Sequence, residues 1–300
     1  MGAFKWRGME SAGDRSDRIL AKHQSLALQS VWRRPLAVVG LLIVTGWVLV
    51  AVFAPVIAQY GPLEQTADIY TPPSVEHWFG TDQLGRDVFS RVVYGSRITL
   101  PMAVMLVALA SAVGSILGGI AGYLSGSVDE TIMRLADLVF AFPAIILAMA
   151  VAAALGPSLR NAVLAVVVVA WPIYARVMRS LVLSAREREY VLASRLTGAS
   201  SREALFSEIL PNVAGPIAVL AMLELGNATL WLAGLSFLGL GAQPPHPEWG
   251  AMVASGALAF NRWWVGLFPG LAILSAVLAF NFIGDSFRDR LDPRITRTFR

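Results

Sequence analysis

Six runs of mostly apolar residues constrain this chain more than any other feature, because each run is long enough to cross a lipid bilayer. A helix that spans the hydrocarbon core needs about 20 mostly apolar residues. The chain is 56% hydrophobic and only 15% charged, whereas a soluble domain is typically about a quarter charged. We therefore predict an all-α polytopic membrane protein with about six transmembrane helices. The spans are expected at about 36–58, 97–124, 131–155, 161–183, 212–235 and 265–284.

The basic residues predict the orientation of these spans, because cytoplasmic loops are enriched in Lys and Arg. With both termini and the loops at 125–130 and 184–211 placed inside, most of the 24 Lys and Arg residues are cytoplasmic. Residues 1–31 are polar and are expected to form a cytoplasmic tail, which leaves 32–300 as the transmembrane domain. The basic residues that do not lie inside are Arg86, Arg91, Arg97, Arg160 and Arg262.

A charged island between the fourth and fifth runs, residues 186–212, has the pattern of a folded segment. The run 187–196 is compatible with a helix, and Ala193 and Ser194 are small residues in its second half. Gly198 follows, and glycine commonly ends a helix in the left-handed conformation. We expect the island to begin with a helix that stops at this glycine.

The second half of the island carries a helix start signal. Ser200 is followed three residues later by Glu203, which is the spacing of a capping box. Pro211 stands at the entrance of the next apolar run, where its missing N–H costs little. A helix–Gly–helix segment between two spans predicts a cytoplasmic docking surface.

Ionisable residues inside two of the runs are candidates for a pathway, because such residues usually face a protein interior or a watery cavity. In the third run, Arg134 and Asp137 have the spacing of an ion pair on one helix face. The alternative for Asp137 is a role along a pathway or in gating. In the fifth run, Glu224 precedes Asn227 by about one turn, and a structural hydrogen bond and a pathway role are both open for Glu224. The candidate pathway residues are therefore Asp137, Glu224 and Asn227.

Proline and glycine predict the shape of two spans. Phe142-Pro143 lies in the third run, where a proline frees a carbonyl and permits a kink. Gly114, Gly118 and Gly122 recur at four-residue spacing in the second run. Such a stripe lets another helix approach closely.

Two longer segments, 59–96 and 233–262, are expected outside the membrane. The second contains the run from Ala251 to Phe260, which is too short to span a bilayer. We expect this run to form an interfacial or re-entrant helix.

The sequence lacks the residues of several kinds of chemistry. It has no cysteine, so disulfides and thiolate metal sites are excluded. Its two lysines, Lys5 and Lys22, do not follow a phosphate-loop pattern. The histidines His23, His77 and His246 are scattered and are interpreted as surface residues. We expect no enzyme activity, no metal or other cofactor and no nucleic-acid partner, so the energy for any transport comes from an ion gradient or a partner.

Four separated motifs resemble one family of membrane proteins. They are EYVLAS (189–194) with Gly198 and ILP (209–211), HWFGTD (77–82) with GRDVFSR (85–91), LSFLGLG (235–241) with EWG (248–250), and NFIGDSFRDRLDP (281–293). In this order they resemble the second, C-type permease of the dipeptide, oligopeptide and nickel ABC importers, over about residues 30–295. Ser194 replaces an alanine of the family's coupling segment, which is a small-for-small change.

The resemblance implies an assembly in the bacterial cytoplasmic (inner) membrane. The partners would be a second, different permease subunit, two cytoplasmic ATP-binding subunits that hydrolyse ATP, and an external solute-binding protein. Closure of the ATPase pair would tilt the spans and alternate access to the pathway. The residues implied in coupling to the ATPase are Glu189, Ala193, Ser194, Gly198, Leu210 and Pro211.

The substrate class and the energy source each leave an alternative. Within the family, peptides are the expected substrate, and nickel or a metal chelate is the alternative. From another class, a proton-coupled secondary transporter would use Asp137 or Glu224 as a proton relay. That alternative predicts paired broken spans in the two halves of the chain, and we see no convincing internal repeat in the sequence.

Overall fold

The fold was analysed in a computed structural model, which describes residues 35–66, 68–189, 191, 196, 200 and 203–291. This part of the chain is helical, and two isolated antiparallel bridges, Gln65 with Arg86 and Thr81 with Asp87, lie in the loop before the second long helix. The prediction of an all-α protein is therefore confirmed. In chain order the elements are α2 (Pro35–Val52), α3 (Ala54–Ile57), α4 (Val88–Leu124), α5 (Gly126–Phe140), α6 (Ala144–Leu155), α7 (Leu159–Arg186), the π-helix η1 (Ala204–Ile209), α10 (Leu210–Phe237), α11 (Trp249–Leu258) and α12 (Trp264–Leu291).

Five of these helices are long and apolar enough to cross a membrane, and the pair α5 and α6 makes a sixth if it counts as one broken span. The two helices of the pair are bent by 94°. The expected kink at Pro143 is thus a complete break, because proline lacks an N–H and disfavours a helical conformation at Phe142. About six spans were expected, and the third of them is this broken pair.

α4 is longer than the span predicted at 97–124, since it begins at Val88.

α4 and α7 form the most extensive helix pair, and the glycine stripe explains how closely they approach. A β-carbon at Gly114 would lie 2.4 Å from the Trp171 carbonyl oxygen, and one at Gly118 would lie 2.2 Å from the Ala175 carbonyl oxygen. Gly122 faces Arg179 of α7 in the same way. The predicted close approach of another helix to this stripe is confirmed.

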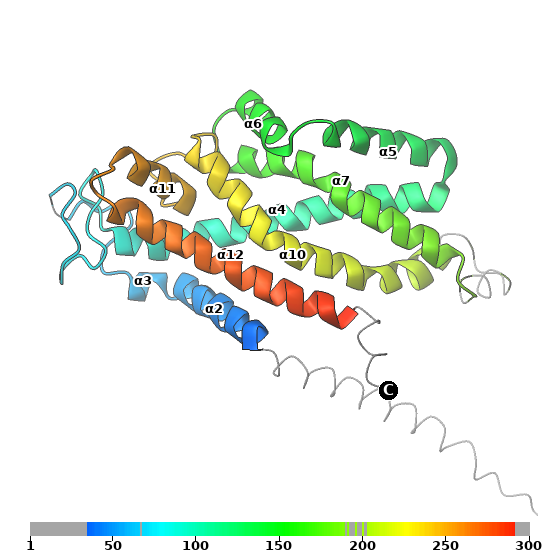
Figure 1. Ribbon diagram of the computed structural model, residues 1–300, viewed down its shortest axis with the longest axis horizontal. Coiled ribbons are helices and arrows are strands. Elements are labelled where there is room, and N and C mark those ends of the chain that lie inside the picture. Colours follow the sequence, from blue (N-terminus) through cyan, green and yellow to red (C-terminus); the bar gives the residue numbers. More distant parts are fainter. Residues whose placement is uncertain are drawn as a thin grey trace, which may run out of the picture.

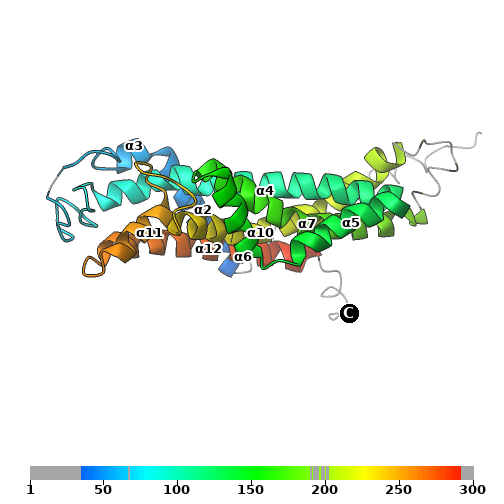
Figure 2. The same ribbon diagram turned by 90° about the horizontal axis from the view of Figure 1, so that it is seen from above.

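The remaining long helices pack around this pair along the long axis of the molecule (Figures 1 and 2). α10 contacts α4, α7, α11 and α12, and α12 packs against α2 on its other side. One apolar cluster, which includes the buried Trp249 and Trp264, joins α4, α10, α11 and α12. A second cluster fills the space between α4, α6, α7 and α10.

The two ends of the molecule differ in character (Figure 1). The loop end carries residues 58–87, α3 and α11. The island end carries the last turns of α7 and the start of α10, and it includes the described residues of the charged island. The described candidate coupling residues, Glu189, Leu210 and Pro211, lie at the island end.

Candidate functional site

The C-terminal end of α7 is tied to the turn between α4 and α5. The Arg186 guanidinium donates from Nη1 to Ser125 Oγ at 2.6 Å and to the Gly122 carbonyl oxygen at 3.3 Å. The second bond satisfies one of the carbonyl oxygens that the end of α4 leaves unpaired. The island therefore begins from a fixed point of the bundle.

A third apolar cluster anchors the island to the bundle. It joins Val191 and Ile209 of the island, both fully buried, to Met178 and Val182 of α7 and to Val213 of α10. Burying each large aliphatic side chain contributes about 1.5–3 kcal/mol. The described part of the island, α7 and α10 therefore share one apolar core.

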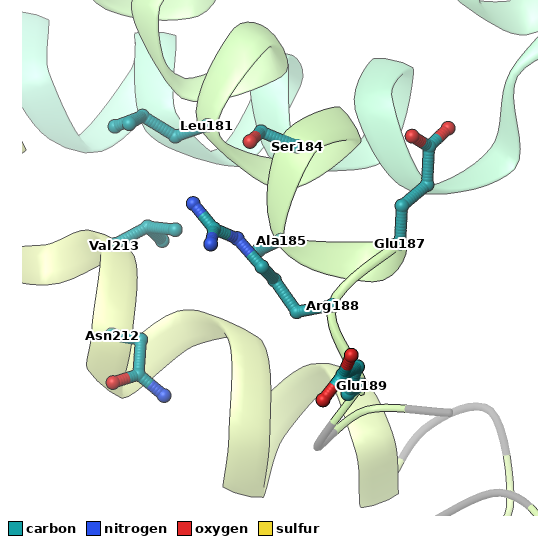
Figure 3. Close-up of a pocket in the computed structure, with 8 residues that line it drawn as sticks. All are labelled: Leu181, Ser184, Ala185, Glu187, Arg188, Glu189, Asn212 and Val213. Atoms are coloured by element: carbon teal, nitrogen blue, oxygen red, sulfur yellow. The ribbon is translucent and has the colours of Figure 1, made fainter. Parts of the chain in front are cut away.

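A hollow of about 870 Å³ lies beside this cluster, between α7 and α10. Figure 3 shows the Arg188 side chain extending into it, with Ser184 on one side and Val213 on the other. Glu187 and Glu189 lie on its rim and are exposed. The site offers exposed charges of both signs above an apolar floor, which suits a protein partner.

The predicted capping box is confirmed. The Ser200 amide donates to Glu203 Oε2 at 2.9 Å, and the Glu203 amide donates to Ser200 Oγ at 3.3 Å. These bonds from Ser200 lower the pKa of the Glu203 carboxyl, because they favour its charged form. Glu203 itself is helical, as the capping box predicts.

The helix after the capping box does not stop before the membrane span. η1 ends at Ile209 and α10 begins at Leu210, so the two are continuous. Pro211 lies in the first turn of α10, as the sequence predicted. One helical element therefore extends from the island into α10.

The candidate coupling residues divide into two groups. Glu189 and Pro211 are exposed and Leu210 is half-buried, all three near the hollow. Ala193, Ser194 and Gly198 lie outside the described residues.

The expected pairing of Arg134 with Asp137 is wrong. Asp137 pairs with Arg176 of α7, and Arg134 pairs with Glu130 one turn earlier on α5. Nearby, Arg179 of α7 holds Asp129 with two hydrogen bonds, the arrangement that fits guanidinium to carboxylate best. α5 is therefore joined to α7 by two ion pairs across the helices.

Glu224 and Asn227 lie together on α10. Asn227 Nδ2 donates to Glu224 Oε2 at 3.2 Å, and Asn227 is exposed while Glu224 is half-buried. Within the described part of the chain, no hydrogen bond or ion pair joins either residue to Asp137. The three candidate pathway residues thus form one pair and one separate position.

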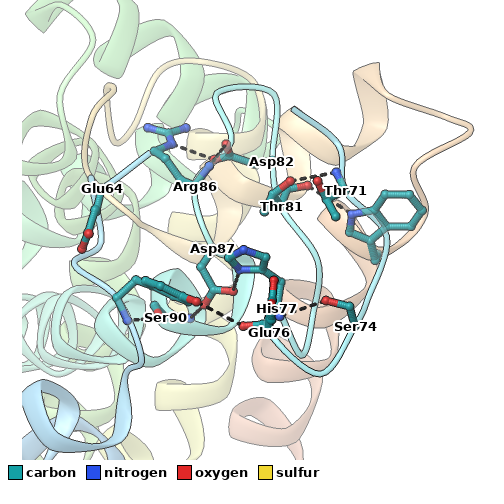
Figure 4. Close-up of polar contacts among 12 residues, drawn as sticks. Glu64, Thr71, Ser74, Glu76, His77, Thr81, Asp82, Arg86, Asp87 and Ser90 are labelled. Atoms are coloured by element: carbon teal, nitrogen blue, oxygen red, sulfur yellow. Dashed lines mark hydrogen bonds and ion pairs between the residues drawn. The ribbon is translucent and has the colours of Figure 1, made fainter. Parts of the chain in front are cut away.

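The loop end holds a polar network that the sequence analysis did not anticipate (Figure 4). His77 is buried, and its Nδ1 lies 3.0 Å from Asp87 Oδ1. Asp87 also accepts from the Ser90 amide at 2.7 Å and so caps the start of α4. The interpretation of His77 as a surface residue is wrong, because the loop folds over the end of α4. His246 is exposed, and His23 lies outside the described residues.

Two further sets of buried charged residues were not predicted from the sequence. Asp82 Oδ2 lies 2.7 Å from Arg86 Nε and 3.5 Å from Arg91 Nε. Glu248 is fully buried and caps α11 by accepting from the amides of Gly250 and Ala251 at 3.0 and 2.9 Å. Glutamate is not among the preferred capping residues, so the sequence carried no signal for this role.

Comparisons with known proteins give these features a context. Residues 114–297 match the family described as "Binding-protein-dependent transport system inner membrane component". The chain belongs to this family. Residues 25–73 of the permease also match "N-terminal TM domain of oligopeptide transport permease C". The resemblance to C-type permeases of ABC importers is confirmed. The family consists of transport components, so the chain is a multi-pass membrane subunit of a transport system.

Individual relatives resemble the permease over most of its length. It is 45% identical to the dipeptide transport system permease protein DppC of Alkalihalophilus pseudofirmus over 271 residues, which are 90% of this chain and 89% of the relative. It is 47% identical to the protein of the same name from Escherichia coli (strain K12) over 281 residues, 89% of this chain and 93% of the relative. It is also 42% identical to the glutathione transport system permease protein GsiD of Escherichia coli (strain 536) over 275 residues, 88% of this chain and 89% of the relative.

Proposed function

We propose that this permease forms half of the translocation pathway of an ATP-driven importer of short peptides. The observation that carries the proposal is the 45–47% identity, over about nine-tenths of both chains, to permeases named for dipeptide transport. The other half of the pathway would be a second, different permease subunit. An external solute-binding protein would deliver the peptide, and two cytoplasmic ATP-binding subunits would hydrolyse ATP.

The island end is proposed to face the cytoplasm, with both termini on that side. Basic residues at this end support the orientation, because Arg176, Arg179, Arg186 and Arg188 all lie in the last turns of α7 or just after it. Positive charge is enriched on the cytoplasmic side of membrane proteins. The loop end, with the network around His77 and Asp87, would then face outward.

The island is proposed to be the docking surface for an ATP-binding subunit. The contact residues would be Glu189, Ala193, Ser194, Gly198, Leu210 and Pro211. Two observations support transmission of movement from this surface: η1 continues into α10, and Val191 and Ile209 are buried against α7 and α10. Rigid elements that share a core move together.

Asp137, Glu224 and Asn227 remain the candidate pathway residues. The hydrogen-bonded pair of Glu224 and Asn227 leaves the Asn227 side chain exposed on an otherwise apolar helix. An exposed polar pair on a spanning helix is expected to face a partner subunit or a watery cavity. The ion pair of Asp137 with Arg176 supports a structural or gating role for Asp137.

Uptake into proteoliposomes tests this proposal. The permease is reconstituted with its partner permease, ATP-binding subunits and binding protein, and entry of radiolabelled dialanine is followed with and without internal ATP. We expect uptake that requires ATP and both kinds of partner subunit. Uptake by the permease alone, driven by a proton gradient, would contradict the proposal and favour the secondary transporter.

A further inference from the structure

A second cavity, of about 490 Å³, lies at the loop end, far from the island. It is enclosed by residues 83–91, by the turn after α10 and by one face of α11. Its volume is within the range of about 300–1,000 Å³ that is usual for small-molecule sites. The polar side chains that line it include Gln83, Arg86, Arg91, Gln243, His246 and Ser255.

The charged side chains that line this cavity are all positive. Arg86 and Arg91 are each only 5% exposed, and both approach the same oxygen of Asp82. The neighbouring Asp87 is bonded to His77 and to the Ser90 amide, and it does not line the cavity. Among the described residues that line the cavity there are two guanidinium groups and no carboxylate. A buried charge without a full partner is costly, so an anionic ligand would be stabilising here.

Both guanidinium groups have N–H donors that make no hydrogen bond to the described part of the protein. Arg86 bonds Asp82 through Nε, and Arg91 donates from Nη1 to the Pro62 carbonyl oxygen at 2.8 Å. Within the part of the chain that the structure describes, the terminal nitrogens of Arg86 and Nη2 of Arg91 have no hydrogen-bond partner. Figure 4 shows the bond from Arg86 Nε to Asp82, in which the terminal nitrogens take no part. Guanidinium groups with free terminal nitrogens are well suited to bind a carboxylate in two-point contact.

Gln83 adds an unpaired acceptor to the same cavity. Its Oε1 is buried and accepts no hydrogen bond in the described structure. A buried acceptor without a donor is unfavourable, so a ligand N–H at this position would also be favoured. The cavity thus combines two cationic donors with one neutral acceptor.

We propose that this cavity binds the C-terminal carboxylate of a short peptide. Arg86 and Arg91 bind the carboxylate oxygens, and Gln83 Oε1 accepts from a peptide N–H. The assignment of a peptide rests on the proposed function, while the need for a carboxylate rests on the two arginines. The site would receive substrate at the loop end, before it enters the membrane region.

Binding to the complex in lipid nanodiscs, with the solute-binding protein and ATP left out, tests the site. Isothermal titration is carried out with dialanine, with its amidated form dialaninamide, and with acetate. We expect dialanine to bind at least about tenfold more tightly than dialaninamide, because amidation removes the charge-assisted hydrogen bonds. Acetate is expected to compete with dialanine.

Variants at Gln83 avoid disturbing the buried arginines. Gln83→Glu supplies a carboxylate beside Arg86 and Arg91, and it should weaken dialanine binding at least about tenfold. Gln83→Met removes the acceptor alone, so the preference over dialaninamide should remain while dialanine binds more weakly. Arg97→Gln is the matched control, because Arg97 is exposed on α4, does not line the cavity, and its loss lowers the net charge by the same unit. This control should bind as the wild type does.

Equal binding of dialanine and dialaninamide, or unchanged binding by Gln83→Glu, would overturn the site even if the complex imports dipeptides. A complex that imports no peptide but binds acetate in a manner abolished by Gln83→Glu would retain the carboxylate site and overturn the proposed substrate. The two failures are therefore distinguishable.

Discussion

Ser200 and Glu203 hold each other through reciprocal hydrogen bonds at the start of the helical segment that continues into α10. Each side chain accepts from the backbone amide of the other, at 3.3 Å for Ser200 Oγ and 2.9 Å for Glu203 Oε2. Because η1 and α10 are continuous, the box stabilises the start of a helical segment that continues into the spanning helix α10. The first prediction concerns this end.

Ser200→Ala should destabilise the first turn of this helical segment without affecting the packing of the long helices. The Glu203 amide loses its partner, and amide hydrogen exchange at Glu203 should accelerate about fivefold, the effect of losing a helix cap. Ser207→Ala is the control, since Ser207 is an exposed residue within η1. Exchange is measured by mass spectrometry on the purified complex, and an unchanged rate in Ser200→Ala would mean that the box does not stabilise this helix.

Gly118→Ala should destabilise the permease, whereas the same change at the adjacent Gly119 should not. A β-carbon at Gly118 would lie 2.2 Å from the Ala175 carbonyl oxygen, and backbone cannot move aside cheaply. A β-carbon at Gly119 would be 3.7 Å from the flexible end of Met178. Overpacking costs about 1–3 kcal/mol, so only Gly118→Ala should lower the melting temperature in detergent. Equal melting temperatures of the two variants would contradict the α4–α7 packing.

Glu248 should make stability depend on pH. Burial raises the pKa of its carboxyl above the ordinary 4.5, although the bonds from Gly250 and Ala251 oppose this shift. An acid with a raised folded-state pKa contributes its full stability below the unfolded pKa, and this stability is lost as pH rises through the folded-state pKa. The melting temperature of the wild type should therefore fall over that interval.

Glu248→Gln removes this titration while keeping one acceptor oxygen for the α11 cap. We expect the melting temperature of this variant to vary less with pH above 4.5 than that of the wild type. Glu76→Gln, at an exposed position in the loop, is the matched control. A wild-type pH profile in Glu248→Gln would show that Glu248 does not titrate differently on folding.

Local signals were predictable from the sequence, and choices between distant partners were not. The capping box at Ser200 depends on residues within one helical turn, so spacing alone indicated it. Pro143 indicated a kink in the third span, but not that the span breaks into two helices. The glycine stripe on α4 indicated a close neighbour, because glycines at four-residue spacing let the backbone of a second helix approach. It could not say that the neighbour is α7.

The partners of the charged residues could not be predicted from the sequence. Asp137 has Arg134 three residues earlier, yet it pairs with Arg176 on another helix. His77 finds Asp87 only because the loop folds back over α4. Two arginines reach one carboxylate at Asp82 for the same reason. Such pairings follow from tertiary packing, which spacing along one element does not determine.

We propose that the island couples ATP hydrolysis in the partner subunits to movement of α10. The most direct test is to measure ATP hydrolysis and dialanine uptake in the same proteoliposomes for Gly198→Val. We propose that Gly198 has a positive φ, where a β-carbon costs about 1–2 kcal/mol, so the variant should redirect the segment after it. Gly215→Val on α10 is the control, because a β-carbon there meets open space. We expect normal membrane insertion of both variants. Only Gly198→Val should reduce uptake per ATP at least tenfold or lose the ATP-binding subunits. Wild-type hydrolysis and uptake in Gly198→Val would contradict it.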